Sequence, residues 1–324
     1  HREASVAYIT VIIVGLFFSI IYNVLAANLR AIGDAYTPLI FLIISAVLNV
    51  VLDILCVKYM DMGVRGAAVA TVVSQAVSAV LCFGYTWKKY AFLHFNIKDF
   101  VPEREFVKPM LEGGLSMGLM NSLVSFGTLS LQTAINTLGT NTIVAHAATR
   151  KLTNLYMLPF SVLGTTMATY SGQNYGAGRY DRIRAGLKVS LGCSYIWCVI
   201  VLVASYTVCP YLIVAITDTN IREVIDTACL YQRFDTCFYL LVPTITILRN
   251  SLQGMGDHIT PIFSSGLELV GKVLIAMLLT PVIGYWGIIV SEPIVWAVMV
   301  IPLIVSMVKR MKRAFVNEKI RNEK

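Results

Sequence analysis

Charged residues are scarce in this sequence. They make up 14% of its 324 residues, whereas typical soluble domains carry about 25%. Apolar residues make up 57%, and this share is too large for an ordinary soluble domain. The composition therefore excludes most soluble enzymes and binding modules before any motif is considered.

Several chemical motifs are missing as well. The seven Cys residues contain no CxxC pair, and the four His residues are isolated in the chain, so neither a zinc site nor a disulfide framework is predicted. A Walker-type phosphate loop is also lacking. The Gly-x-Gly of QNYGAGRYDRIR (173–184) follows no strand, as a dinucleotide fingerprint would require. We expect no metal, no cofactor and no ATP hydrolysis.

The sequence contains long apolar blocks instead. A transmembrane helix needs ~20 mostly apolar residues to cross a hydrocarbon core of ~30 Å. Nine blocks approach or exceed this length: 6–28, 38–57, 66–86, 110–136, 142–169, 186–207, 227–248, 261–281 and 286–308. We therefore predict an all-α polytopic membrane protein with about nine transmembrane helices.

The basic residues are distributed unequally over the predicted loops. Most of the 26 Lys and Arg residues fall in one set of alternate loops, and Arg249 is counted there with the residues after 308. Short basic loops stay cytoplasmic, so we place the C-terminal tail inside and His1 outside, in the plasma membrane. The net charge of +8 then marks topology and attraction to anionic lipid, and we expect no nucleic-acid partner.

One short frame occurs twice in the chain. LRAIGDAYTPLI (29–40) aligns with LQGMGDHITPIF (252–263), so that Gly33 matches Gly256 and Asp34 matches Asp257. Gly-Asp permits a tight turn, and Thr-Pro suits the first turn of the next helix. We therefore predict structural turns at these four residues.

The repetition extends beyond this frame. GVRGAAVATVVSQAV (63–77) matches GYWGIIVSEPIVWAV (284–298), in a register that is shifted by two residues from that of the first match. The shift places a slip in the loop between the two matches. Spans one to three thus resemble spans seven to nine. Internal repeats of three or six helices are typical of transporters, with the substrate path between the repeats.

The repeat also predicts a domain organisation. Spans four to six have no counterpart upstream, and the chain starts without Met, so we expect about three preceding helices and twelve in total. Residues 1–88 would be the last three helices of an N-terminal lobe, and 89–109 a cytoplasmic connector. Residues 110–308 would form a complete six-helix C-terminal lobe, followed by a basic cytoplasmic tail at 309–324.

Three segments resemble a known family in its own order. The fourth to sixth spans of the multidrug and toxic compound extrusion (MATE) family are similar to LRAIGDAYTPLIFLIISAVLNVVLDIL and GVRGAAVATVVSQ. Its eighth span and later Gly-Asp turn resemble MLPFSVLGTTMATYSGQNYGAGRYDRIRAGL and LRNSLQGMGDHITP. The resemblance implies two six-helix lobes around a central cavity. It also implies export of organic, often cationic compounds in exchange for H+ or Na+.

Polar residues inside spans are costly to insert and are usually functional. Asn49 and Asp53 lie four residues apart, on one helix face, and Thr71 lies early in the next span. By resemblance, these three match positions of the family's cation-coupling site, and their oxygens suit a hard cation. The alternative is that Asn49 only packs locally and that Asp53 sits near the outer interface beside Lys58.

The second repeat carries its own polar residues. Glu268 and Lys272 lie four residues apart in the eighth span, where they form either a structural salt bridge or part of the cavity. Asp235 could bind a cation, although it lies about two turns further outward than the matching family position. Its neighbour Arg233 is expected to extend to the interface.

The fifth and ninth spans add three more charges. Arg150 and Lys151 are adjacent, so their side chains point about 100° apart. We expect one of them to line the cavity and the other to pair or to extend to the interface. Glu292 precedes Pro293, and a cavity role and a structural role remain open for it.

The sequence therefore predicts a non-enzymatic antiporter that works by alternating access. Its partners would be small-molecule substrates, cationic or hydrophobic, and the lipid bilayer, and we expect a monomer. A lipid-linked oligosaccharide flippase of related architecture is the main alternative, because Arg150, Lys151 and Lys272 could face a pyrophosphate. A membrane-embedded lipid-modifying enzyme is a further alternative, but it would need clustered acids or histidines, and the sequence has neither.

Overall fold

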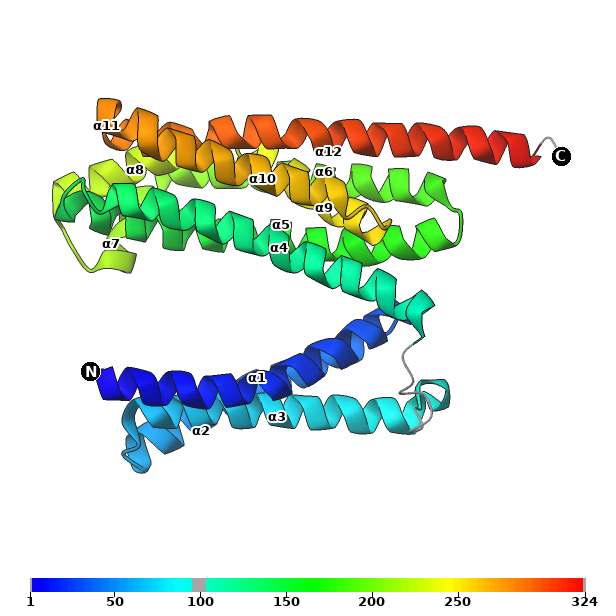
Figure 1. The fold of residues 1–324 in the computed structure, drawn as a ribbon. Helices are drawn as coiled ribbons and strands as arrows, with labels where there is room; N and C mark the ends of the chain where they lie inside the picture. Colours follow the sequence, from blue (N-terminus) through cyan, green and yellow to red (C-terminus); the bar gives the residue numbers. More distant parts are fainter. Residues whose placement is uncertain (1, 95–102, 323–324) are drawn as a thin grey trace. The chain divides into compact units, whose positions relative to one another are not determined.

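The structure is a computed structural model that describes residues 2–94 and 103–322. These residues are almost entirely helical, and no strand occurs within the two described ranges (Figure 1). The chain divides into two compact units, His1–Pro102 and Glu103–Lys324. Within each unit the helices pack against one another.

In the first unit the other helices pack around the last long helix, α3. The elements of this unit are α1 (Arg2–Ala31), α2 (Tyr36–Asp53), the π-helical segment η1 (Ile54–Tyr59), α3 (Gly63–Lys89) and the 3₁₀ turn η2 (Ala91–Leu93). Both α1 and α2 pack mainly against α3. A methyl group on Gly15 would meet Val72 Cγ2 at 2.3 Å, so the missing side chain at Gly15 lets α1 approach α3 closely.

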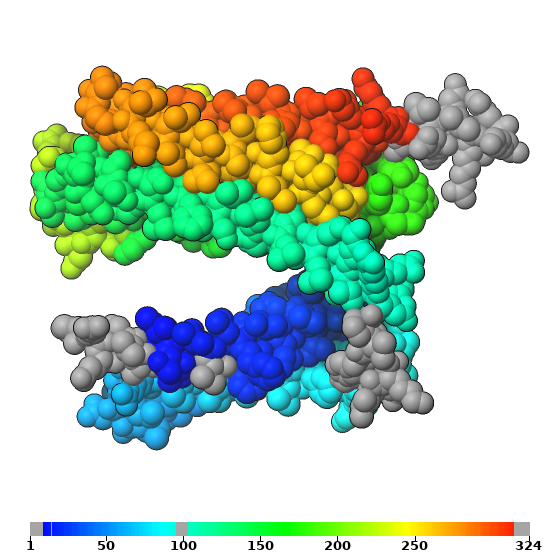
Figure 2. Space-filling view, in the orientation of Figure 1, coloured from blue at the N-terminus to red at the C-terminus, as the bar shows by residue number. Residues whose placement is uncertain are grey.

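The second unit is a larger helical bundle. Its elements are α4 (Arg104–Ile135), α5 (Thr140–Gly176), α6 (Tyr180–Thr207), α7 (Cys209–Thr217), α8 (Arg222–Thr236), α9 (Leu241–Gly254), α10 (Ile259–Leu274), the π-helical segment η4 (Ile275–Leu279), α11 (Thr280–Ile283) and α12 (Tyr285–Asn322). The helix α5 packs against α6, α7, α8 and α9, while α10 lies between α4 and α12. Figure 2 shows α4 and α10 side by side on the surface of this unit.

Two glycines bring α5 and α9 together. A methyl group on Gly254 would lie 2.1 Å from the carbonyl oxygen of Ala168, and one on Gly172 would lie 3.0 Å from the carbonyl oxygen of Gly254. A Cβ atom cannot occupy the first position without a shift of the backbone, and the second position is at the limit of contact. The close approach of these helices therefore depends on the absence of side chains at both residues.

Six of the described helices are long and apolar enough to cross a membrane. They are Ile9–Ala31, Tyr36–Tyr59, Gly63–Lys89, Tyr180–Thr207, Ile259–Ile283 and Tyr285–Arg313. The other three predicted spans correspond to α4, α5 and the pair α8 and α9, whose sequences are more polar. The chain is thus an all-α polytopic protein.

Several element boundaries differ from the sequence-based expectation. The predicted seventh span is interrupted between Thr236 and Leu241, where α8 ends and α9 begins. Pro243 explains the break, because proline lacks an N–H and its ring clashes with the carbonyl four residues earlier, that of Tyr239. At the other end of the unit, α12 continues through the basic tail to Asn322.

The first Gly-Asp frame forms a turn between α1 and α2. Gly33 has a φ of 95°, which favours glycine. The carboxylate of Asp34 accepts hydrogen bonds from the backbone N–H of Thr37 at 3.1 Å, the Thr37 hydroxyl at 3.0 Å and the hydroxyls of Tyr85 and Tyr90. Burial alone would raise the pKa of Asp34, but hydrogen bonds from Thr37, Tyr90 and Tyr85 outweigh it and lower the pKa to about 2.

The second Gly-Asp frame repeats this geometry between α9 and α10. Gly256 has a φ of 78°, and Asp257 accepts from the N–H of Thr260 at 3.1 Å and from its hydroxyl at 2.8 Å. Ser306 and Arg310 also donate to Asp257, at 2.8 and 3.2 Å. Burial would raise the pKa of Asp257, but bonds from Thr260 and Ser306 and the charge of Arg310 outweigh it and lower the pKa.

The slip between the repeats does not lie in a loop, as the sequence suggested. The helices α2 and α10 begin at equivalent places, Tyr36 and Ile259, but α2 has 18 residues and α10 has 16. The π-helical segments that follow them begin at Ile54 and Ile275, which are equivalent in the register that aligns Gly63 with Gly284. The difference is therefore taken up within the α-helices.

Candidate functional site

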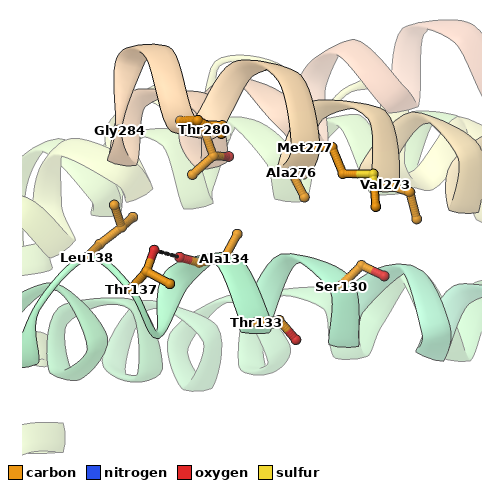
Figure 3. A pocket seen from close by; sticks show the side chains of 11 residues that line it. Ser130, Thr133, Ala134, Thr137, Leu138, Val273, Ala276, Met277, Thr280 and Gly284 are labelled. Carbon is orange, nitrogen blue, oxygen red and sulfur yellow. Dashed lines mark hydrogen bonds between the residues drawn. The ribbon is translucent and has the colours of Figure 1, made fainter.

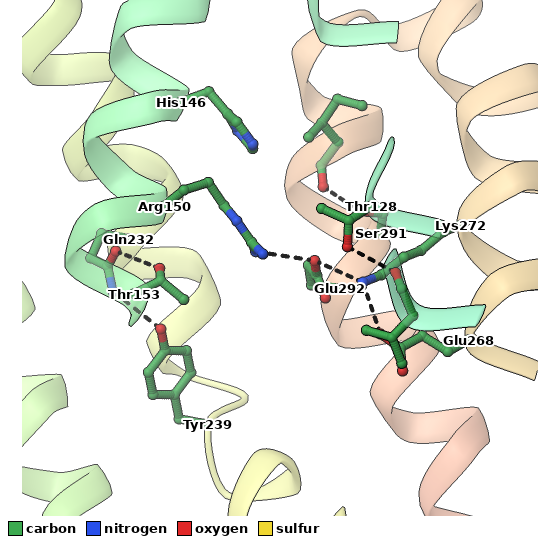
Figure 4. Close-up of polar contacts among 12 residues, drawn as sticks. Thr128, His146, Arg150, Thr153, Gln232, Tyr239, Glu268, Lys272, Ser291 and Glu292 are labelled. Carbon is green, nitrogen blue, oxygen red and sulfur yellow. Dashed lines mark hydrogen bonds and ion pairs between the residues drawn. The ribbon is translucent and has the colours of Figure 1, made fainter. Parts of the chain in front are cut away.

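A chain of buried charges crosses the second unit, with Lys272 at its centre (Figure 4). The Nζ atom of Lys272, on α10, lies 2.9 Å from Glu268 Oε1 and 3.3 Å from Glu292 Oε1 on α12. Lys272, Glu268 and Glu292 are 2%, 6% and 5% exposed, respectively. Glu268 and Lys272 are thus paired along the helix, as their spacing allowed, and Glu292 joins them from the neighbouring helix.

An arginine lies at each end of this ionic chain. Arg150 NH1, on α5, lies 3.3 Å from the same Glu292 oxygen that Lys272 contacts. At the other end, Arg249 NH2, on α9, lies 3.7 Å from Glu268 Oε2 and donates to Ser264 Oγ at 3.4 Å. Positive and negative groups therefore alternate across α5, α12, α10 and α9.

Asp235, on α8, lies within electrostatic range of this network. Arg150, Glu292 and Lys272 all interact with its charge. Its side chain is 1% exposed, and its Oδ1 atom has no hydrogen-bond partner among the described residues. Asp235 is therefore a buried acid with a free acceptor.

A neutral group lies one turn away on the same helix. Gln232 is fully buried, accepts from the Thr153 hydroxyl at 3.3 Å, and donates to the Tyr239 hydroxyl at 3.4 Å (Figure 4). The first bond ties α8 to α5, and the second joins α8 to the turn before α9. They fix the polar surroundings of the buried acid.

The chemistry of this network follows from its charge balance. The ionic chain holds the cations Arg150, Lys272 and Arg249 and the carboxylates of Glu268 and Glu292, and Asp235 supplies a further acid. Removing one partner from a buried ion pair leaves an uncompensated charge, which costs about 3–5 kcal/mol. Binding or release of one proton or cation would therefore redistribute the pairing among four helices.

The residues predicted for cation coupling lie in the first unit. Asp53 is the last residue of α2, directly before the π-helical segment η1. The Nδ2 atom of Asn49 and the Oδ1 atom of Asp53 are buried and have no hydrogen-bond partner within the described ranges. Thr71, on α3, instead donates its hydroxyl to the carbonyl of Ala67 in its own helix, at 2.9 Å.

Arg150 and Lys151 face different surroundings, as their positions on one helix turn require. Arg150 turns inward to Glu292, whereas Lys151 is exposed. Arg233 lies over the ring of Tyr206 at 5.7 Å and donates to the carbonyl of Ser205 at 3.4 Å. Most of the intramembrane charges predicted in the second unit thus meet in the ionic chain: Glu268, Lys272, Glu292 and Arg150.

Sequence reasoning missed one member of the ionic chain. Arg249 was assigned to a basic cytoplasmic loop, but it lies inside α9 with a side chain only 12% exposed. The apolar block 227–248 ends just before it, which made Arg249 look like a loop residue. No local spacing links Arg249 to Glu268, so only the packing of α9 on α10 identifies the pair.

An open pocket lies beside the network, between α4 and the segment formed by α10, η4 and α11 (Figure 3). Its volume is about 670 Å³. Figure 3 shows Val273, Ala276 and Met277 above the hydroxyl-bearing face of α4. The hydroxyls of Ser130, Thr133, Thr137 and Thr280 all bond carbonyls of their own helical segments, so the pocket offers a mainly apolar lining. Among the described residues no cluster of three His, Cys, Asp or Glu side chains could hold a metal ion.

The sequence matches one family over most of its length. A family model described as MatE matches residues 2–55 and 117–282. Among curated proteins, Bacillus subtilis (strain 168) "Probable multidrug resistance protein YpnP" is 30% identical over 176 residues, which is 54% of this chain and 39% of that protein. "Probable multidrug resistance protein YoeA" of the same strain is 23% identical over 309 residues, or 91% of this chain and 66% of the relative.

A third relative, "Multidrug export protein MepA" of Staphylococcus aureus (strain MSSA476), is 24% identical over 274 residues, or 84% of this chain and 57% of that protein. The chain thus spans less than two thirds of the length of the curated relatives it matches.

Solved structures share the fold. An outward-facing MATE family transporter of the MOP superfamily superposes with a TM-score of 0.88 at 22% identity, over 96% of this chain and 70% of the other. An inward-facing conformation of such a transporter gives a TM-score of 0.70 at 21% identity, over 96% and 72%. The matched fold is therefore known in both conformations.

Proposed function

This chain belongs to the MatE family, whose members are transporters rather than enzymes, and on that basis we propose that the protein is a secondary active efflux transporter. It exports organic compounds, cationic or hydrophobic, in exchange for H+ or Na+. Relatives described as multidrug resistance and multidrug export proteins support this proposal. Outward-facing and inward-facing structures of the fold support alternating access as the mechanism.

Asp53 is the proposed coupling residue, and its surroundings carry this part of the proposal. The carboxylate has a buried oxygen without a hydrogen-bond partner among the described residues, and Asn49 presents a buried amide on the same helix face. Asp53 also directly precedes a π-helical turn, a feature that is frequent at functional sites. Its structural equivalent at the end of α10 is Leu274, so the acid is not a requirement of the repeated fold.

Asp235 is a second candidate for coupling, supported by a different observation. It is 1% exposed with a free acceptor oxygen, and it interacts with the charges of the ionic chain. Uptake of a proton or cation there would change the balance of three cations and three acids. Asp53 would couple through its own carboxylate, whereas Asp235 would couple through the ionic chain.

The flippase alternative is less well supported by the same geometry. A pyrophosphate site needs cationic side chains that are free to bind it. Arg150, Lys272 and Arg249 each contact a carboxylate, so none of the three side chains is free to bind it. We assign these cations to the internal network. We also propose that the protein acts as a monomer in the plasma membrane with its C-terminus inside.

Reconstitution of the full-length protein tests the proposal. Vesicles with the cytoplasmic face of the protein inside would be loaded with a cationic dye and given an inward-directed gradient of H+ or Na+, one ion at a time. Dye efflux that follows one gradient and stops when an ionophore collapses it is the expected result. Dye efflux that is independent of both gradients would contradict the proposal.

A further inference from the structure

A basic pocket opens at one end of the second unit, away from the ionic chain. It has a volume of about 440 Å³ and lies between the first turns of α10 and the last part of α12. Three cationic side chains line it: Lys309, Arg310 and Arg313. The wall next to them is apolar and is formed by Ile259, Phe263, Pro302 and Val305.

The pocket lies at the level of the lipid headgroups. The candidate membrane span of α10 begins at Ile259, so α10 meets the membrane surface here. On α12 the apolar block ends at residue 308, directly before the basic residues Lys309 and Arg310. A helix rises 1.5 Å per residue, which puts Phe263 about 6 Å deeper than Ile259 and Val305 about 6 Å deeper than Lys309. The cationic rim therefore faces the interface, and the deeper apolar residues Phe263, Pro302 and Val305 face the acyl chains.

The cationic side chains of the pocket outnumber its acidic side chains. Asp257 also lines it, but its carboxylate is occupied by Thr260, Ser306 and Arg310. Lys309 and Arg313 are exposed, and no ion pair joins either of them to another described residue. Two uncompensated cations thus stand above an apolar wall, beside a helix N-terminus that favours negative charge.

We propose that this pocket binds the phosphate headgroup of an anionic phospholipid, whose acyl chain lies along Phe263 and Val305. The complementarity of charge at the rim and of apolarity below it fits an amphipathic anion. Basic pockets between membrane helices commonly take such headgroups. The proposal does not depend on the transport activity.

The first repeat shows why the pocket is open. In the register that aligns Gly63 with Gly284, Tyr85 is the equivalent of Ser306, and the Tyr85 hydroxyl donates to Asp34 as the Ser306 hydroxyl does to Asp257. The smaller serine keeps the hydrogen bond and leaves the volume of an aromatic ring empty. Ser306→Tyr would therefore fill the pocket without removing any of its charges.

The test is lipid retention by the purified full-length protein in detergent, measured by native mass spectrometry. Equal amounts of phosphatidylglycerol and phosphatidylcholine with the same acyl chains would be offered. Arg313→Gln and Ser306→Tyr are the test variants. Lys312→Gln is the matched control, because Lys312 is exposed and does not line the pocket.

We expect the wild type to retain phosphatidylglycerol in preference to phosphatidylcholine. Each cation near an anionic surface contributes ~1 kcal/mol, so Arg313→Gln should weaken retention about fivefold. Ser306→Tyr should also reduce it, while Lys312→Gln leaves it unchanged. Equal losses in Arg313→Gln and Lys312→Gln would show diffuse attraction and overturn the proposal. Displacement of the lipid by inorganic phosphate would also overturn it, and so would unchanged retention in Ser306→Tyr.

Discussion

Asp34 and Asp257 occupy the same position in two copies of one turn, and each accepts the N–H of the threonine three residues later at 3.1 Å. In both copies the carboxylate also receives a hydroxyl from the third helix of its repeat. A cation follows four residues after that hydroxyl: Lys89 in one copy, Arg310 in the other. The repeated frame therefore encodes a contact between three helices as well as a turn.

Loss of either turn carboxylate should destabilise the protein. Replacing a side chain that caps a helix by alanine costs about 1 kcal/mol, so we expect Asp34→Ala and Asp257→Ala to lower the unfolding temperature by similar amounts. Thermal unfolding in detergent measures the effect. The control is Asp218→Asn, which removes an exposed carboxylate. Asparagine is used instead of alanine because Asp218 has a positive φ.

The turn carboxylate also predicts a pH dependence. The pKa of Asp34 in the folded protein is about 2, below the ordinary value of about 3.9. A lowered folded-state pKa gives stability that is present above pH ~4 and is lost as the pH falls toward 2. The difference in unfolding temperature between wild type and Asp34→Asn should therefore shrink over this window. A constant difference between pH 5 and pH 2.5 would count against the assignment.

The central lysine of the ionic chain should be essential for stability. Lys272→Met leaves Glu268 and Glu292 without their shared cation, and we expect a loss of about 3–5 kcal/mol. Adding Glu268→Gln removes one of the two carboxylate charges that have lost this partner and should recover part of the loss. Unfolding of the single and double variants measures this coupling.

Lys151→Met provides the control for that experiment. Lys151 is exposed on the helix that carries Arg150, and surface substitutions usually change stability by less than about 0.5 kcal/mol. If Lys151→Met destabilised the protein as much as Lys272→Met, the buried chain would have no special role. Additive effects of Lys272→Met and Glu268→Gln would lead to the same conclusion.

Close packing of α5 on α9 should make Gly254 intolerant of substitution. The Cβ of Gly254→Ala would collide with the carbonyl of Ala168, and a backbone oxygen cannot move aside without shifting the helix, at a cost of about 1–3 kcal/mol. Gly266→Ala is the matched control, since nothing lies within 4 Å of its Cβ. That variant should gain about 0.5–1 kcal/mol from the better helix propensity. Equal unfolding temperatures for the two variants would contradict the close contact.

The sequence predicted features that depend on local pattern. Apolar blocks long enough to span a hydrocarbon core identified the helices. The repeated Gly-Asp frame predicted both turns because the positive φ of Gly33 and the hydrogen bonds between Asp34 and Thr37 are local. The pairing of Glu268 with Lys272 also follows from a spacing of four residues. In each case the deciding contact lies within one or two helical turns.

The rest of the site depends on contacts between distant residues. Arg150 and Glu292 are 142 residues apart, and no pattern in either segment indicates that they meet. Arg249 looked like a loop residue because the apolar block ends beside it. The π-helical segment after Asp53 adds one residue to a helical turn, and no glycine or proline within it marks the change. The segment after Leu274 is followed by Pro281, whose ring clashes with the carbonyl of Met277.

Within the proposed coupling site, the three residues should differ in importance. The hydroxyl of Thr71 is bonded within its own helix, so Thr71→Ala should reduce transport less than Asn49→Ala, whose amide nitrogen is buried without a partner among the described residues. Initial rates of gradient-driven dye efflux measure both variants. A larger loss in Thr71→Ala would place the ion away from Asn49.

The most direct test of the account compares dye efflux with dye binding in Asp53→Asn. The substitution keeps the shape of the side chain and removes only its charge, so equilibrium binding of a cationic dye to the full-length protein should stay within about twofold of wild type. Gradient-driven efflux should fall by about tenfold or more, because the coupling ion then has no differential affinity for the two conformations. Wild-type efflux from Asp53→Asn, with loss of efflux in Asp235→Asn instead, would contradict the assignment of coupling to the first unit.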